Sequence, residues 1–369
     1  MYADFLVLFN DTIDVTRFFL DTAVYWAPLV LAVAFWNLWM RYKITNYISN
    51  IEWMTLEIKL PKEIHETPLA MEAVMNAFYQ TPKDNGHDQY FKRRVRNWFS
   101  LEIVSIEGAV KFFIRTPAFF KNIIETRIYS QYPAIEIHEV PDYTKYVDYR
   151  GKKGDLDIWG AEFALVKKDA YPIKTYVDYE LDNEGAKEEQ KVDPMVAVIE
   201  ALRSTGKGEQ MWVQILVQAT GDGLKSFRRF KKKEWKGEGK FGCGARAVYL
   251  AKRDAFDSSN VSALMGIFRH YQSSNLNSFK PINRYTTSFD HPWQDFKDMR
   301  MTMKKLKLFN AYKRRSWFNP PYKRKSFVLN AKELATLYHF PSGVAETPIF
   351  GKVEAKKGES PANLPTSGE

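Results

Sequence analysis

Six histidines are the first residues to consider for metal binding or acid–base chemistry. They are His65, His87, His138, His270, His291 and His339. No two of them have the spacing that places a zinc-binding pair on one face of a helix. We expect His138 to point to solvent from a strand, and His339 to end a helix, where the helix dipole favours a positive charge. The histidines therefore predict no metal site.

Phosphate-binding loops are not indicated either. The motif G-x-x-x-x-G-K-[ST] does not occur in the sequence. Residues 204–208 (STGKG) resemble its end, but they follow an expected helix and place Gly208 where the Mg²⁺-binding hydroxyl is needed. A glycine that caps a helix C-terminus explains this run better. Residues 221–226 (GDGLKS) are expected to form a turn after a strand.

The remaining reactive side chains have no recognisable partners. The single cysteine, Cys243, lies between glycines with no histidine nearby, which favours a structural thiol. One cysteine also excludes an internal disulfide framework and fits a reducing compartment. Nothing distinguishes Glu102, Glu107, Glu136 or Glu139 from ordinary surface carboxylates. We therefore expect a protein that is not an enzyme and that has no catalytic residue, no cofactor and no metal.

Three basic clusters with interleaved aromatic residues are the strongest candidates for a binding function. Their proposed contact residues are Lys92, Arg93, Arg94, Arg96, Lys225, Arg228, Arg229, Lys231, Lys232, Lys233, Arg314, Arg315, Lys323, Arg324 and Lys325. The neighbouring aromatic residues are Trp98, Phe99, Phe227, Phe230, Trp235, Phe309, Tyr312, Trp317 and Phe318. Positive charge combined with stacking surface is typical of single-stranded nucleic-acid binding. Contact with anionic lipid or with an acidic protein stays open, and the net charge of +10 suits all three.

An uncharged apolar segment covers residues 22–40 (TAVYWAPLVLAVAFWNLWM). Its length is close to the ~20 residues that cross a hydrocarbon layer of about 30 Å. Trp26, Trp36 and Trp39 lie near its ends, where interfacial rings are favoured, and Pro28 lies in its first turns. We expect a transmembrane helix over 22–43. A buried helix of a soluble domain is the alternative, and a signal peptide fits less well because the basic residues follow the apolar run.

The flanking charges predict the orientation of this helix. Asp4, Asp11, Asp14 and Asp21 precede it, whereas Arg41, Lys43 and a basic body follow it. The positive-inside rule places residues 1–21 outside and the body in the cytoplasm. We therefore expect a single-pass protein of the inner or cytoplasmic membrane.

The body predicts an α+β fold of two tandem ferredoxin-like (βαββαβ) domains, over 50–145 and 171–285, joined by a connector at 146–170. The expected strands are 53–60, 98–106, 110–115, 134–140, 173–181, 210–219, 244–252 and 279–282. The expected helices are 69–79, 118–132, 195–204 and 258–274, with Thr67 and Asp193 as N-caps before prolines. Glu107 and Gly108 indicate a hairpin turn.

The C-terminal part is expected to be irregular. Residues 286–344 form a basic and aromatic segment, with a strand at 327–330 and a short helix at 331–338 that Asn330 can cap. Residues 345–369 are rich in Pro, Gly and Glu and are expected to form an extended or disordered tail.

Several runs, in the same order, resemble a known family. They are 98–105 (WFSLEIVS), 113–117 (FIRTP), 128–133 (IYSQYP), 334–341 (LATLYHFP), 347–348 (TP) and 363–365 (NLP). They are similar to the N-terminal, non-motor region of membrane-anchored bacterial conjugation and type IV secretion ATPases of the HerA/FtsK-like class. In that family the last run leads into the ATPase domain, whereas this chain stops at Glu369. No catalytic residue is therefore carried over.

The resemblance implies a function and partners. It implies a membrane-anchored docking component of a conjugation-like or type IV secretion-like transfer machine, which works with a separately encoded ATPase, contacts DNA and forms a homo-oligomer. The implied docking residues are Leu334, Leu337, Tyr338, Phe340 and Pro341. The alternative is a membrane-tethered nucleic-acid-binding protein that acts alone through its basic segments.

Overall fold

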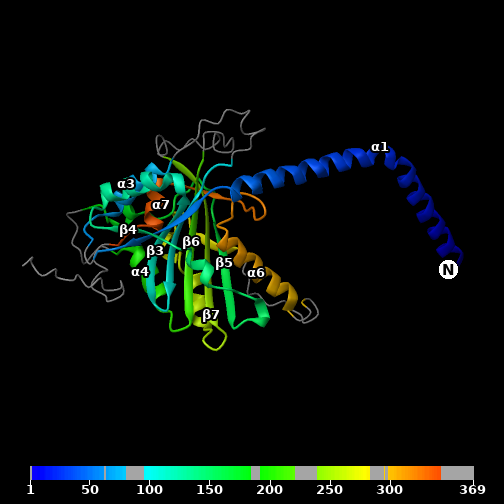
Figure 1. Cartoon of the computed structure of the whole chain (residues 1–369). Coiled ribbons are helices and arrows are strands. Elements are labelled where there is room, and N and C mark those ends of the chain that lie inside the picture. Colours follow the sequence, from blue (N-terminus) through cyan, green and yellow to red (C-terminus); the bar gives the residue numbers. More distant parts are fainter. Residues whose placement is uncertain are drawn as a thin grey trace, which may run out of the picture.

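A long N-terminal helix is joined to a body built on one antiparallel sheet in the computed structural model (Figure 1). The structure describes residues 2–61, 64–79, 95–183, 192–220, 239–282, 295 and 298–341. The protein is therefore of mixed α+β type, as the sequence predicts.

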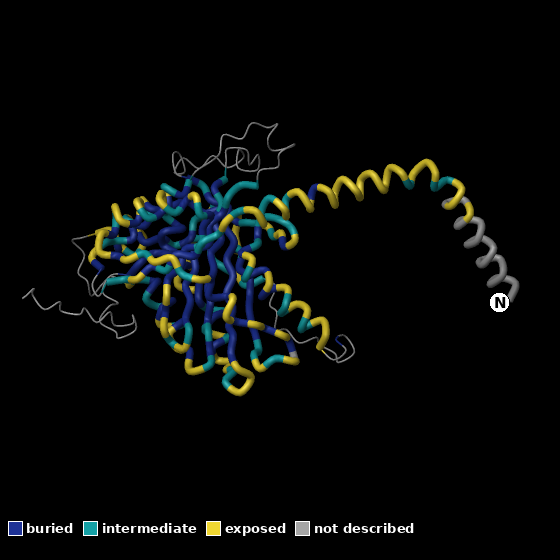
Figure 2. Tube along the Cα trace, viewed as in Figure 1, coloured by how far each residue is buried: buried dark blue, intermediate teal, exposed yellow. Residues whose placement is uncertain are grey.

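Helix α1 (Tyr2–Ser49) runs without a break through both of the expected N-terminal segments. Pro28 consequently lies inside the helix and not in its first turns. Among the described residues, the part over Leu20–Ser49 is one helix long and apolar enough to cross a membrane. It projects away from the body with its side chains exposed (Figure 2), including Trp26, Trp36 and Trp39. This exposure removes the alternative of a helix buried in a soluble core.

Nine strands form a single sheet rather than two separate ones. They are β1 (Trp53–Lys59), β2 (Phe99–Ile106), β3 (Ala109–Pro117), β4 (Glu136–Val140), β5 (Leu156–Leu165), β6 (Glu209–Ala219), β7 (Lys240–Lys252), β8 (Phe279–Ile282) and β9 (Phe327–Asn330). Their order is β4-β1-β3-β2-β6-β7-β5-β8, and β9 pairs with β7. Strands β2 and β6 pair along their whole length, from Phe99 opposite Val217 to Ile106 opposite Gln210. The two predicted units therefore share one continuous sheet.

The sequence pattern predicted the first strand of the second half in the wrong segment. Strand β5 (Leu156–Leu165) lies inside the predicted connector, whereas the predicted strand at 173–181 contains a 3-10 turn, η5 (Tyr176–Tyr179). The Thr175 hydroxyl and backbone N–H donate to Asp178, and this capping arrangement favours the turn over an extended chain. Local side-chain hydrogen bonds therefore overcame the alternating pattern of that segment.

Within the described residues, six helices cover the two faces of the sheet. They are α2 (Pro68–Ala77), α3 (Lys121–Gln131), α4 (Pro194–Arg203), α5 (Ser258–Met265), α6 (Met299–Lys313) and α7 (Ala331–Leu337). Asp193 caps α4 and Asn330 caps α7, as expected, whereas the Thr67 side chain makes no capping bond to α2. Helix α5 ends at Met265, with Gly266 as its C-cap, short of the predicted 274. Helix α6 was not predicted.

The larger core lies between one sheet face and the helices α2, α3, α4, α5 and α7. A smaller core lies on the opposite face, where α6 contributes Leu308, Phe309 and Tyr312. The strands in the middle of the sheet are therefore buried on both faces. Their polar residues on the α6 face are enclosed, which is the structural basis of the site described below.

The predicted docking run belongs to the larger core. Leu334, Leu337, Tyr338 and Phe340 are each at most 2 % exposed, and Pro341 is also buried. The rings of Tyr338 and Phe340 pack edge-on against Phe112, with centroid distances of 5.8 and 5.5 Å. The docking assignment is therefore wrong for these side chains, because they contact their own domain.

Gly244 supplies a test of the packing on the α6 face. A Cβ there would lie 2.2 Å from the Trp317 ring, whereas a Cβ on Gly242 would meet its nearest neighbour at 3.3 Å. We expect Gly244→Ala to lower the free energy of unfolding by about 1–3 kcal/mol through overpacking. Urea denaturation of the full-length protein in detergent measures this change, with Gly242→Ala as control. Equal midpoints for the two variants would contradict the packing described.

Candidate functional site

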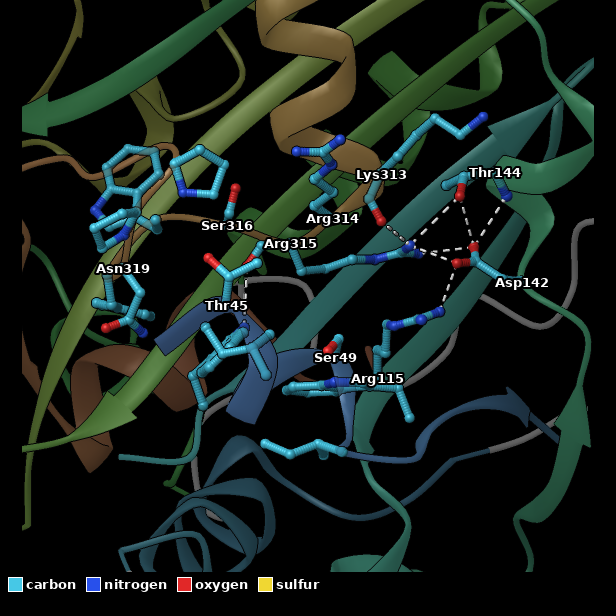
Figure 3. Close-up of a pocket in the computed structure, with 18 of the residues that line it drawn as sticks. Thr45, Ser49, Arg115, Asp142, Thr144, Lys313, Arg314, Arg315, Ser316 and Asn319 are labelled. Carbon is cyan, nitrogen blue, oxygen red and sulfur yellow. Dashed lines mark hydrogen bonds and ion pairs between the residues drawn. The ribbon is translucent and has the colours of Figure 1, made fainter. Parts of the chain in front are cut away.

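A cavity of about 580 Å³ lies where the end of α1 meets the body. Its lining comes from the end of α1, from the starts of β1 and β2, from the end of β3, from 142–145 and from the chain that follows α6 (Figure 3). The lining residues are Thr45, Ile48, Ser49, Ile51, Trp53, Trp98, Arg115, Asp142, Thr144, Lys145, Lys313, Arg314, Arg315, Ser316, Trp317, Phe318, Asn319, Pro320 and Pro321. The volume is in the range of small-molecule sites.

One wall of the cavity is aromatic. The rings of Trp53 and Trp98 lie 4.8 Å apart, and the Trp98 indole N–H donates to the Arg315 carbonyl over 3.0 Å. Trp98 and Trp317 are buried together, and Ile48 from α1 packs against them. The end of α1 is thus fixed to the body by apolar contact rather than joined to it by a free linker.

The floor of the cavity is a buried ion network. The Arg315 guanidinium donates to Glu102 over 2.8 and 3.0 Å and to Asp142 over 2.6 and 3.0 Å. Arg115 donates to the same Asp142 carboxylate over 2.5 Å. Glu102 also accepts from Tyr143 and Gln214. Two cations and two carboxylates therefore neutralise one another.

These contacts determine the protonation of both carboxyl groups. Burial raises the pKa of Asp142, but the charges of Arg315 and Arg115 outweigh it and lower that pKa to about 2. Burial likewise raises the pKa of Glu102, while the charge and hydrogen bonds of Arg315 bring it below its ordinary value. Both groups are consequently carboxylates near neutral pH, which excludes them as general acids.

Four buried polar residues continue from this network across adjacent strands. Glu102 on β2 lies opposite Gln214 on β6, which lies opposite Arg246 on β7, which lies opposite Glu162 on β5. All four are fully buried.

The chain after α6 closes over this row. Arg246 donates to the Ser316 carbonyl over 2.7 Å, and Tyr322 donates to Glu162 over 2.8 Å. Arg324 forms an ion pair with Glu162 at 3.0 Å. The row thus holds residues 315–324 on the sheet.

The basic residues predicted to contact a ligand differ in their burial and in their ion pairing. Arg315 is buried, so its assignment to a surface contact is wrong, and Arg324 is committed to Glu162. Arg314, Lys323 and Lys325 are exposed, and Arg96 is half-buried. Lys92, Arg93, Arg94, Lys225, Arg228, Arg229, Lys231, Lys232 and Lys233 lie outside the described residues.

The proposed stacking aromatics are mostly core residues. Trp98, Phe99, Phe309, Tyr312 and Trp317 are buried, which contradicts a role as exposed stacking surface. Phe227, Phe230 and Trp235 lie outside the described residues. Phe309 and Tyr312 of α6 belong to the smaller core, and Trp317 of the chain after α6 packs with Trp98.

Three cations outside the ion network also line the cavity, and we call them its rim: Lys145, Lys313 and Arg314. Lys145 and Arg314 are exposed, and half-buried Lys313 donates to the Val147 carbonyl over 3.2 Å. Within the described part of the chain, no carboxylate forms an ion pair with any of the three. The site therefore has a neutral floor, an aromatic wall and a positively charged rim.

His339 forms a separate buried pair with Asp193. Its Nε2 lies 3.1 Å from both Asp193 oxygens, and its Nδ1 contacts the Ala335 carbonyl. Burial lowers the pKa of His339, but the Asp193 charge outweighs this effect and raises it above its ordinary value. His339 therefore joins two helix ends through a charged contact, which the sequence did not indicate.

Cys243 and His138 were also considered as reactive side chains in the sequence. Cys243 is buried, and burial raises the pKa of its thiol, so it is a structural residue as predicted. His138 is exposed beside Glu136. Over the residues that the structure describes, no three His, Cys, Asp or Glu side chains gather in a way that could hold a metal.

Sequence reasoning missed Glu102, Asp142 and Arg115 as site residues. One signal was available for Glu102: it lies in the run WFSLEIVSI, which is apolar at most positions on both faces of a strand. A charged residue in a strand that is covered on both faces needs a buried partner. The partner, Arg315, is 213 residues away in the chain and could not be identified without the fold.

The Arg315 network predicts a large and specific loss of stability. Arg315→Met leaves two carboxylates buried near a single guanidinium, so we expect the free energy of unfolding to fall by about 3–5 kcal/mol. Arg314→Met, at the exposed neighbouring position, should change it by less than about 0.5 kcal/mol. Urea denaturation followed by tryptophan fluorescence measures both. A similar small effect for the two variants would show that the network is not stabilising.

The His339–Asp193 pair predicts that stability falls with rising pH. Because the pKa of His339 is raised in the folded state, its contribution is complete below about pH 6.5 and is lost as the pH rises through the folded value. We expect the Tm of His339→Gln to fall less than that of the wild type between about pH 6 and about pH 9. His138→Gln, at an exposed site, is the control and should keep the wild-type profile. Parallel profiles for all three proteins would contradict the assignment.

Comparison with known proteins adds no family to this description. No protein-family model and no curated protein matches the chain. Among solved structures, 6-hydroxy-D-nicotine oxidase from Arthrobacter nicotinovorans is 10 % identical with a TM-score of 0.30, over 72 % of this chain and 51 % of the oxidase. This chain thus spans about half the length of the oxidase. A candidate chlorite dismutase is 9 % identical with a TM-score of 0.14, over 63 % of this chain and 94 % of that one. Neither likeness is strong enough to carry an argument about fold or function.

Proposed function

We propose that this protein is a single-pass, membrane-anchored docking component of a conjugation-like or type IV secretion-like transfer machine. The observation that carries the proposal is the geometry of α1 (Tyr2–Ser49). An apolar helix with exposed side chains leads directly into the body, and its last turn packs against Trp53, Trp98 and Trp317. An anchor that is packed onto its domain transmits position and orientation from the membrane to the body.

The flanking charges support a cytoplasmic body. Acidic residues precede the apolar segment, and Arg41 and Lys43 follow it immediately. Arginine and lysine are retained on the cytoplasmic side of the inner membrane. The body, with the cavity rim of Lys145, Lys313 and Arg314, then faces the cytoplasm.

The partner assignment rests on the family resemblance of several ordered sequence runs. We propose that a separately encoded ATPase of the HerA/FtsK-like class supplies the motor, and that copies of this chain assemble around it. The strand orders β4-β1-β3-β2 and β6-β7-β5-β8 are compatible with two fused βαββαβ units, which also supports this reading. The docking surface must lie elsewhere than 334–341, because that run is buried.

A membrane-tethered nucleic-acid-binding protein is the second candidate. Arg314, Lys323 and Lys325 are exposed along one segment beside α6, and they favour this alternative. Binding through phosphates makes affinity fall steeply with salt.

The anchor predicts a specific extraction behaviour. Leu31→Arg combined with Phe35→Arg introduces two charges into the proposed span, at a cost of about 2.5–3.5 kcal/mol each near its centre. We expect the wild type to stay in the membrane pellet after an alkaline carbonate wash, and this variant to be released. Leu69→Arg combined with Phe119→Arg, at exposed apolar sites of the body, is the matched control and should stay in the pellet. Release of the wild type would contradict the anchor.

Purification of the tagged full-length protein from membranes, with and without nuclease, tests which partner it binds. The co-purified protein chains and nucleic acid are then identified. Recovery of an ATPase that resists nuclease supports the docking function. Recovery of nucleic acid alone, lost at high salt, would contradict it in favour of the second candidate.

A further inference from the structure

We propose that the cavity between the end of α1 and the body binds the phosphodiester headgroup of an anionic phospholipid from the leaflet that faces the body. This inference rests on the proposed membrane anchor. It goes beyond a general attraction of basic segments to lipid, because it assigns one cavity, one rim and one ligand chemistry.

The position of the cavity along α1 fits a headgroup. The uncharged segment ends at Met40, and the first α1 residue in the cavity lining is Thr45. Five residues of helix rise about 8 Å. The headgroup layer extends roughly 5–8 Å beyond the hydrocarbon on each side of a bilayer. Thr45 therefore lies at the outer edge of the headgroup layer, within reach of a lipid phosphate.

The charges around the cavity fit an anion. Lys145, Lys313 and Arg314 carry positive charges that no described carboxylate pairs, whereas Arg115 and Arg315 are neutralised by Asp142 and Glu102. In Figure 3, the side chains of Lys313 and Arg314 extend away from the Arg115–Asp142–Arg315 network. An anion in the cavity therefore meets three lining cations that no described carboxylate pairs. Basic pockets beside transmembrane helices are typical anionic-headgroup sites.

The apolar part of the lining fits the carbon atoms of the glycerol and headgroup. Ile48 lies eight residues beyond Met40, about 12 Å along the helix, so this part of the cavity lies outside the hydrocarbon layer. Trp53, Trp98 and Phe318 line the cavity with it. A free phosphate would use the cationic rim alone, whereas a phospholipid uses the rim and the apolar side together. The combination favours a lipid over a soluble phosphate ester.

The test measures binding of phosphatidylglycerol to the full-length protein in neutral detergent by native mass spectrometry. Each cation near a membrane surface contributes roughly fivefold in affinity (about 1 kcal/mol). We expect the double variant Lys145→Gln and Arg314→Gln to bind the first phosphatidylglycerol about 25-fold more weakly than the wild type. Both residues are exposed, so the variant should fold normally.

The control replaces Lys323 and Lys325, which are exposed on the same segment but outside the cavity lining, by glutamine. It removes the same net charge and should change the affinity less than twofold. Equal weakening by the two double variants, or no weakening by either, would overturn the proposed site. Two further arms use phosphatidylcholine, which should bind at least tenfold more weakly, and glycerol 3-phosphate. Binding of glycerol 3-phosphate as tightly as the lipid would overturn the assignment to a membrane lipid.

Failure of this inference can be distinguished from failure of the anchor. The carbonate wash tests the anchor in membranes, whereas the lipid titration is made in detergent and depends only on the cavity. An anchored protein whose two double variants bind lipid equally well contradicts the site alone. A wild type released by carbonate contradicts the anchor, whatever the titration gives.

Discussion

Arg315 is buried between Glu102 and Asp142, and this contact ties three distant parts of the chain together. A buried guanidinium is tolerated only when carboxylates and hydrogen bonds replace its hydration, and here two carboxylates do so. Glu102 comes from the central strand β2, Asp142 from the segment after β4, and Arg315 from the chain that follows α6. Their contact therefore holds α6 on the sheet and forms the floor of the cavity.

The same polar face explains why the two halves of the chain form one sheet. Strands β2 and β6 join them, and at that junction Glu102 lies opposite Gln214 and accepts its amide hydrogen over 2.9 Å. The row continues through Arg246 to Glu162, so four strands are linked by buried polar groups on the side that α6 covers. In this register Gln214 donates to Glu102, and Arg246 lies 3.7 Å from Glu162. A slip of one residue would turn these side chains to the other face of the sheet, which favours a single alignment of the halves.

The end of α1 packs directly on the body and lines the cavity. The helix does not end in a flexible linker: Ile48 packs beside Trp98 and Trp317, and Trp317 is held by the same segment that carries Arg315. The apolar helix, the cavity and the polar row are thus parts of one contiguous structure. A ligand in the cavity would contact α1 and the body at the same time.

Signals carried by neighbouring residues were enough to predict several local features. The charge-free run at 22–40 indicated the apolar helix, and Asp193 and Asn330 indicated two helix starts. Glu107 and Gly108 indicated the hairpin, and both adopt a left-handed backbone there. The face that each charged residue meets depends on contacts between distant parts of the chain. In the fold, Arg315, Leu334 and Tyr338 are buried, and 173–181 contains a 3-10 turn in place of a strand. Glu102 pairs with Arg315, which is 213 positions away in the chain. A solvated charge and a buried, paired charge have the same one-letter code, and the difference between them lies in partners that only the fold brings together.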